Sequence, residues 1–172
     1  MNSPIQFPIL KRLSLPLCFI VCFLVFSFPT IAQEKPPKPI SVQVSTLQHL
    51  NFGTFIQTGT NGTVTVTYDG ARSATGGVIL PNTGAFSSSA LFEVTALPGT
   101  LITILNGSNA ILSGSNTGSL TMVPGEASTR SPFIATSEIT NVFIGGTLTV
   151  GSMSANPAGE YSGTFQVTFI QQ

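Results

Sequence analysis

The C-terminal end of the sequence alternates between apolar and polar residues, and this alternation constrains the fold more than any other feature. Successive side chains of a strand point to opposite faces of its sheet, so a period of two is typical of a strand with one buried face. The apolar and small residues fall on one side and the polar ones on the other: Tyr161, Gly163, Phe165, Val167 and Phe169 against Ser162, Thr164, Gln166 and Thr168. Residues 145–150 form an earlier segment of the same kind. Asn156-Pro157 and Gly159, which lie between the two segments, favour a turn there. Residues 145–172 are therefore predicted to form two strands joined by a loop.

The same pattern recurs upstream in short segments divided by turn residues. Asp69-Gly70 and Pro98-Gly99 favour tight turns, and a loop rich in Gly, Ser and Asn is expected over 106–118. No window keeps the 3.6-residue period of a helix long enough to predict one. Besides the C-terminal pair, the predicted strands are 40–45, 50–56, 63–68, 75–80, 90–96, 100–105, 139–144 and one that begins at Leu120 and stops at Pro124-Gly125, with a turn over 59–62.

About eight to ten short strands with alternating faces predict an all-β fold. Such strands cannot bury apolar side chains within one layer, so two antiparallel sheets are expected to pack face to face as a β-sandwich. A closed barrel is the alternative. Alternation also predicts that both tyrosines, Tyr68 and Tyr161, point inward. Four phenylalanines are predicted to lie in the core: Phe52, Phe92, Phe165 and Phe169.

The N-terminus has the pattern of a secretory signal peptide. Lys11 and Arg12 precede an apolar run over 13–28, and Thr30-Ile31-Ala32 supplies the small residues of a cleavage site. Sixteen helical residues would span only about 24 Å of a hydrocarbon core about 30 Å thick, which argues against a membrane anchor. Neither Cys18 nor Cys22 follows the small residue that lipid attachment requires. We expect a signal peptide over 1–32, a proline-rich tether over 33–39 and a single domain over 40–172.

Cleavage after Ala32 would leave four Lys and Arg residues against six Asp and Glu residues, a net charge of −2. This balance offers no clustered basic surface, which excludes binding to nucleic acid. Both cysteines leave with the signal, so no disulfide is expected in the exported chain.

The first predicted strand, 40–45, could pair within its own domain or be donated to a neighbour, because an apolar edge is a template for either. The strands from Phe52 onward suffice for a sandwich without help, which favours pairing within the domain.

Side chains that could carry chemistry are scattered along the sequence. His49 is the single histidine, and no motif marks Ser41 or Ser45 as a nucleophile for it. The carboxylates belong mostly to turns and solvent faces, and a calcium site at Asp69 or Glu126 with loop carbonyls is a minor alternative. We therefore expect no enzyme and no catalytic, cofactor-binding or metal-binding residues. The lack of Trp and the predicted inward Tyr side chains also weaken a lectin interpretation.

Five motifs of the predicted strands and turns are distinctive: Leu50-Asn-Phe-Gly53, Thr75-Gly-Gly-Val78, Phe92-Glu-Val-Thr-Ala-Leu-Pro-Gly99, Gly145-Gly-Thr-Leu-Thr-Val150 and Gly159-Glu-Tyr-Ser-Gly-Thr-Phe-Gln-Val-Thr168. They resemble an uncharacterised family of exported Gram-negative proteins, a domain of unknown function that looks related to the pilin-like sandwiches of fimbrial major subunits and spore coat protein U. The resemblance spans about residues 40–172. It implies an immunoglobulin-like sandwich in the periplasm, at the outer surface or in an extracellular fibre. The expected function is a structural or adhesive surface subunit that associates through edge strands, and the alternative is an extracellular ligand- or carbohydrate-binding module.

Overall fold

The computed structural model describes residues 41–44 and 48–172. The chain divides into two units, residues 1–37 and 38–172, and all the described residues belong to the second. The predicted signal peptide, the two cysteines and the predicted tether lie outside the described residues, as do residues 40 and 45 of the first predicted strand.

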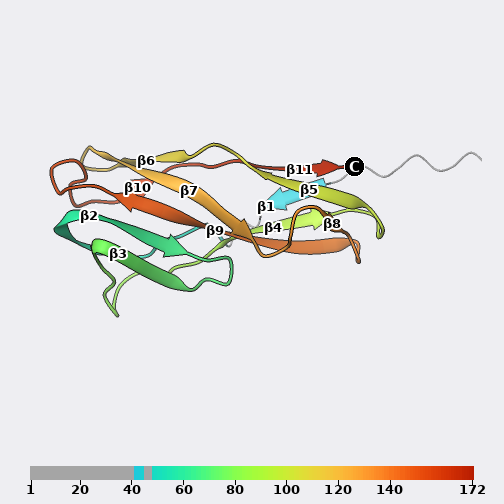
Figure 1. Cartoon of the computed structure of the whole chain (residues 1–172), viewed down its shortest axis with the longest axis horizontal. Coiled ribbons are helices and arrows are strands. Elements are labelled where there is room, and N and C mark those ends of the chain that lie inside the picture. Colours follow the sequence, from blue (N-terminus) through green and yellow to red (C-terminus); the bar gives the residue numbers. More distant parts are fainter. Residues whose placement is uncertain (1–40, 45–47) are drawn as a thin grey trace, which may run out of the picture. The chain divides into compact units, whose positions relative to one another are not determined.

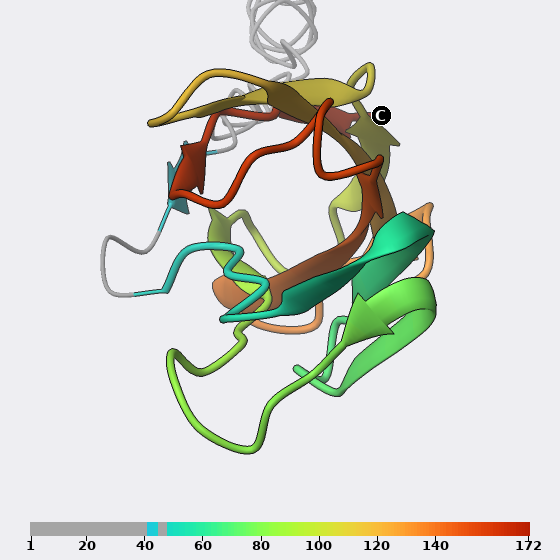
Figure 2. The same cartoon turned by 90° about the vertical axis from the view of Figure 1, so that its left-hand side faces the viewer.

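The described chain forms eleven strands and no helix, arranged in two antiparallel sheets of a β-sandwich, as predicted. Eight strands make the larger sheet: β1 (Ser41–Val44), β2 (Ile56–Val66), β3 (Arg72–Ile79), β4 (Ala90–Thr95), β6 (Ala110–Gly114), β7 (Ser119–Ala127), β9 (Ile139–Val150) and β10 (Tyr161–Ser162). The smaller sheet has the order β11 (Val167–Gln171), β5 (Leu101–Asn106), β8 (Phe133–Ile134). Viewed end-on, the larger sheet curls, and the strands of the two sheets surround a common interior (Figure 2).

The long strand β9 organises the larger sheet (Figure 1). Its first half pairs with β4, its second half pairs with β2, and β7 lies along its other edge. The change of partner occurs at Gly145, between the pairs Ala90↔Ile144 and Val66↔Gly146. A Cβ on Gly145 would lie 2.0 Å from the carbonyl oxygen of Val66, so only glycine lets β2 approach this closely. The bulge itself lies opposite, in β7, between Pro124 and Ala127.

The first described strand pairs within its own chain. β1 runs antiparallel to β4, with Ser41 opposite Thr95 and Val44 opposite Phe92. This register agrees with the pairing that we favour for residues 40–45, and it makes β1 the edge of the larger sheet next to β4.

The predicted C-terminal strand has the predicted faces. Phe165, Val167 and Phe169 are half-buried, whereas Thr164, Gln166 and Thr168 are exposed. The segment is divided into two strands, because β10 pairs with β6 and β11 pairs with β5, while residues 163–166 between them belong to no strand. Its inward side chains remain only half-buried, as expected where a strand is paired along one edge alone.

The core consists of two apolar clusters joined by shared neighbours. One lies among β2, β3, β6, β7 and the second half of β9, and the other among β4, β5 and the first half of β9. Leu50 and Phe165 pack against both. Phe52 and Phe92 are buried, as predicted. Phe165 and Phe169 are half-buried and pack on Phe92, with ring centroids 6.2 Å and 5.8 Å from its ring.

Several predicted boundaries are wrong, and the eleven strands exceed the eight to ten predicted. Over 50–55 no strand forms: Asn51 makes only an isolated bridge to Ser88, and β2 begins at Ile56. β2 runs through the predicted turn over 59–62, and the register shift against β3 between Gln57 and Gly62 absorbs the extra residues. The predicted loop over 106–118 contains β6, because Ile111 and Leu112 pair with Thr121 and Leu120 of β7. β7 passes through Pro124-Gly125, since a bulge accommodates residues that would end a regular strand.

The turn at Asp69-Gly70 forms as predicted, but Tyr68 does not point inward. Gly70 has a φ of 83°, and its N–H donates to the carbonyl of Thr67 at 2.9 Å. The alternation of β2 ends at Val66, where the turn begins, so Tyr68 leaves the strand face and is 45% exposed. This correction removes one objection to carbohydrate binding.

Candidate functional site

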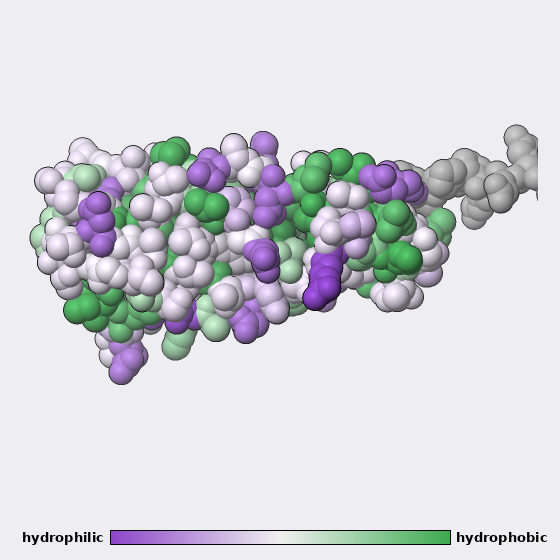
Figure 3. Space-filling view, in the orientation of Figure 1, coloured by the Kyte–Doolittle hydropathy of each residue, from purple (hydrophilic) through white to green (hydrophobic). Residues whose placement is uncertain are grey.

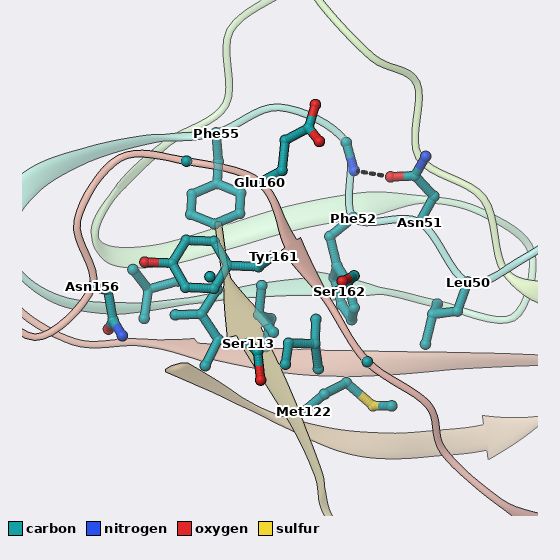
Figure 4. Close-up of a pocket in the computed structure, with 18 of the residues that line it drawn as sticks. Leu50, Asn51, Phe52, Phe55, Ser113, Met122, Asn156, Glu160, Tyr161 and Ser162 are labelled. Carbon is teal, nitrogen blue, oxygen red and sulfur yellow. Dashed lines mark hydrogen bonds between the residues drawn. The ribbon is translucent and has the colours of Figure 1, made fainter. Parts of the chain in front are cut away.

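A groove of about 1580 Å³ opens between two chain segments, residues 48–57 and 156–165. Side chains from the larger sheet form its floor, and the rings of Phe55 and Tyr161 lie close together across it (Figure 4). The floor residues are Ala90, Phe92, Leu120, Met122, Leu148 and Val150.

One wall, residues 50–55, is positioned by hydrogen bonds to neighbouring loops. Asn51 and Ser88 exchange backbone hydrogen bonds of 2.8 and 2.9 Å. The Arg72 guanidinium of β3 donates from Nη1 to the carbonyls of Phe52 and Thr54, both at 3.1 Å, and from Nη2 to that of Pro81 at 3.4 Å. Arg72 therefore holds this wall through backbone groups that no strand pairs.

Arg72→Ala is expected to lower the free energy of unfolding by about 1 to 3 kcal/mol, because it removes a charged donor from three carbonyls. Urea unfolding measures the loss, and amide exchange at Gly53 and Thr54 should rise with it. Arg130→Ala is the matched control, because Arg130 is exposed. Equal losses in the two variants would contradict the assigned role of Arg72.

The opposite wall is held in place by Asn156, which is buried and whose side-chain oxygen and nitrogen both form hydrogen bonds. Its Oδ1 accepts from the N–H of Gly151 at 2.5 Å, and its Nδ2 donates to the carbonyl of Ser119 at 2.5 Å. The hydroxyl of Tyr161 donates to the carbonyl of Pro157 at 2.6 Å, which orients its ring along the groove. The Nε2 of Gln57 donates to the carbonyl of Gly151 and so ties the first wall to the sheet.

The floor of the groove is apolar, and the ionisable residues of its lining are His49, Glu160 and Tyr161. Residues 52–55 and 163–166 belong to no strand, so both walls present backbone groups outside the regular ladders. An extended apolar chain could contact the floor with alternate side chains and the walls with its backbone. This geometry suits the binding of an extended apolar chain.

The structure does not bring together the side chains that the sequence analysis weighed as carriers of chemistry. His49 is exposed and its carbonyl accepts from the hydroxyl of Ser88 at 2.6 Å, while Ser45 and the side chain of Ser41 lie outside the described part. Within the described residues no three His, Cys, Asp or Glu side chains lie close enough to hold a metal ion, and Asp69 and Glu126 are not brought together. Sequence reasoning missed the groove. Its one sequence signal is the pair of aromatic residues Phe52 and Phe55 on a segment that we predicted to be a strand.

A family model described as a domain of unknown function, DUF4402, matches residues 42–170. The chain belongs to the DUF4402 family. The match extends over both walls of the groove, so the DUF4402 domain includes all of this candidate site. No curated protein and no solved structure matches the chain. Over the described residues, the DUF4402 domain has no helix of the length and apolar character needed to cross a membrane.

Proposed function

We propose that the protein is a non-enzymatic, exported structural or adhesive subunit of the cell surface, pilin-like in its assembly, that associates with copies of itself or with other surface subunits. Its site of action is the periplasm, the outer surface or an extracellular fibre. The observation that carries this proposal is the apolar groove flanked by two extended segments outside the strand ladders. An apolar groove bounded by chain segments outside the ladders favours the docking of an extended segment of another chain.

The surface character supports association. The face in Figure 3 is mostly pale, with apolar patches and few strongly hydrophilic residues. Ile56 and Ile79 oppose each other across β2 and β3 and are 52% and 54% exposed. Leu101 and Ile134 likewise form an exposed pair on the smaller sheet. Apolar patches of this kind mark interaction surfaces.

Light scattering after size exclusion tests the proposal on purified residues 33–172. The protein is expected to form oligomers whose size grows with concentration. Phe55→Arg should reduce this association by placing a charge in the groove. Phe86→Arg is the matched control, because Phe86 is 91% exposed and lies outside the groove. A protein that stays monomeric at every concentration, or that loses association equally with both variants, would contradict the proposed use of the groove.

A ligand-binding module is the second candidate, and the exposure of Tyr68 favours it. Ligand binding would use a second surface around Tyr68, which shares only Gln48 with the lining of the groove.

A further inference from the structure

A second hollow, of about 670 Å³, lies beside the Asp69-Gly70 turn. Its volume falls within the range of about 300 to 1000 Å³ that is typical of small-molecule sites. Five parts of the fold converge on it: the segment before β2, the β2–β3 turn, the serines before β4, the residue after β7 and the middle of β9. The lining residues are Gln48, Tyr68, Asp69, Gly70, Ser87, Ser88, Ser89, Ser128 and Phe143.

Tyr68 gives this hollow an accessible aromatic ring. The side chain is 45% exposed and lines the hollow at the start of the turn. A tyrosine ring can pack against the C–H face of a sugar while its hydroxyl reaches a polar partner. Phe143 of β9 is half-buried and adds an apolar surface nearby.

Asp69 supplies a preorganised acceptor. Its Oδ1 accepts from the hydroxyl of Thr67 and from the N–H of Ala71, the latter at 3.3 Å. Both of these bonds are made by Oδ1, so Oδ2 is the oxygen that can accept from a ligand. The hydroxyl of Thr67, followed by the N–H of Ala71, lowers the pKa of Asp69, so the carboxylate is ionised at neutral pH.

Serine hydroxyls complete the polar lining. Ser128 Oγ accepts from the N–H of Phe143 at 2.9 Å, and no described acceptor takes its proton. Ser87 Oγ reaches the carbonyl of Gly70 only at 3.4 Å, so a better acceptor on a ligand can replace it. These groups both donate and accept, as the hydroxyls of a ligand require.

The charges of the lining select the ligand class. Asp69 is the charged residue among them, and no Lys, Arg or His lines the hollow, so an anionic ligand would be repelled. An apolar ligand would bury Asp69 Oδ2 and the hydroxyl proton of Ser128 without giving either a partner. We propose that this hollow binds a neutral sugar, packed on the ring of Tyr68 and hydrogen-bonded to Asp69 and Ser128.

Saturation-transfer NMR with purified residues 33–172 tests this site with three probes: maltose, cellobiose and N,N′-diacetylchitobiose. At least one should receive saturation at millimolar concentration. Tyr68→Ala should weaken its binding about tenfold or more, whereas Tyr68→Phe should keep the ring contact and most of the affinity. Phe86→Ala removes another exposed ring outside the hollow and should bind as the unmodified protein does.

Two results would overturn the sugar site, and a third would reassign it. Absence of saturation transfer to all three sugars would overturn the proposal, as would equal losses in Tyr68→Ala and Phe86→Ala. Calcium binding that is abolished by Asp69→Asn, without sugar binding, would reassign the hollow to a cation. Phe55→Arg, designed against association, should leave sugar binding intact, so failure of the assembly proposal would not be mistaken for failure of this one.

Discussion

Phe92→Ala is expected to lower the free energy of unfolding by about 3 to 5 kcal/mol, a large share of the roughly 5 to 15 kcal/mol that stabilises a domain. Phe92 is buried on β4 and packs against Phe165 and Phe169. Its removal would leave a cavity where the C-terminal segment meets the larger sheet. Urea unfolding followed by circular dichroism gives the change.

The C-terminal segment provides the matched comparison. Phe165→Ala should cost about 1.5 to 3 kcal/mol, because its ring is half-buried against both apolar clusters. Thr164→Ala, on the opposite and exposed face, should change stability by less than about 0.5 kcal/mol. Equal losses at positions 164 and 165 would show that the faces of this segment are wrongly assigned.

Gly145→Ala is expected to cost at least about 3 kcal/mol, at the upper end of what overpacking a core usually costs. The added Cβ would lie 2.0 Å from the carbonyl oxygen of Val66 and 2.7 Å from the carbonyl carbon of Thr67. Both are backbone atoms at the end of β2, in the same chain, so no side chain can rotate away to relieve the contact. β2 would have to separate from β9.

Gly99→Ala is the control for Gly145→Ala. Gly99 has a φ of 91° but no atom within 4 Å of an added Cβ. The substitution should therefore lower the free energy of unfolding only by the strain of a left-handed alanine, about 1 to 2 kcal/mol. Thermal unfolding compares the two variants. A larger loss at position 99 than at position 145 would contradict the change of strand partner inferred at Gly145.

The parts of the fold that sequence could predict are those where local alternation coincides with burial. β4 shows this directly, because Phe92 and Val94 are buried as their spacing predicts. The failures arise where long-range pairing overrides local turn chemistry. Gly59 and Gly62 lie within one irregular strand because β3 supplies partners on both sides of the register shift. Pro124 stays in β7 because β9 continues alongside it.

The candidate sites were harder to predict than the strands. The groove depends on two walls about one hundred residues apart in the sequence, Phe52 to Phe55 and Tyr161 to Phe165, and no local pattern indicates that they face each other. The hollow was missed because alternation was extended to Tyr68, although the turn begins before it. The Asp69-Gly70 motif marked that turn, and the exposure of its neighbouring aromatic residue could have been inferred from it.

Immunogold electron microscopy of the native cell surface, with antibodies raised against residues 33–172, tests the proposed function most directly. If the protein is a structural or adhesive surface subunit, label should lie on the outer surface or along fibres in regular arrays, and Phe55→Arg should disperse those arrays. Label confined to the cell interior, or unchanged arrays in Phe55→Arg, would contradict assembly through the groove.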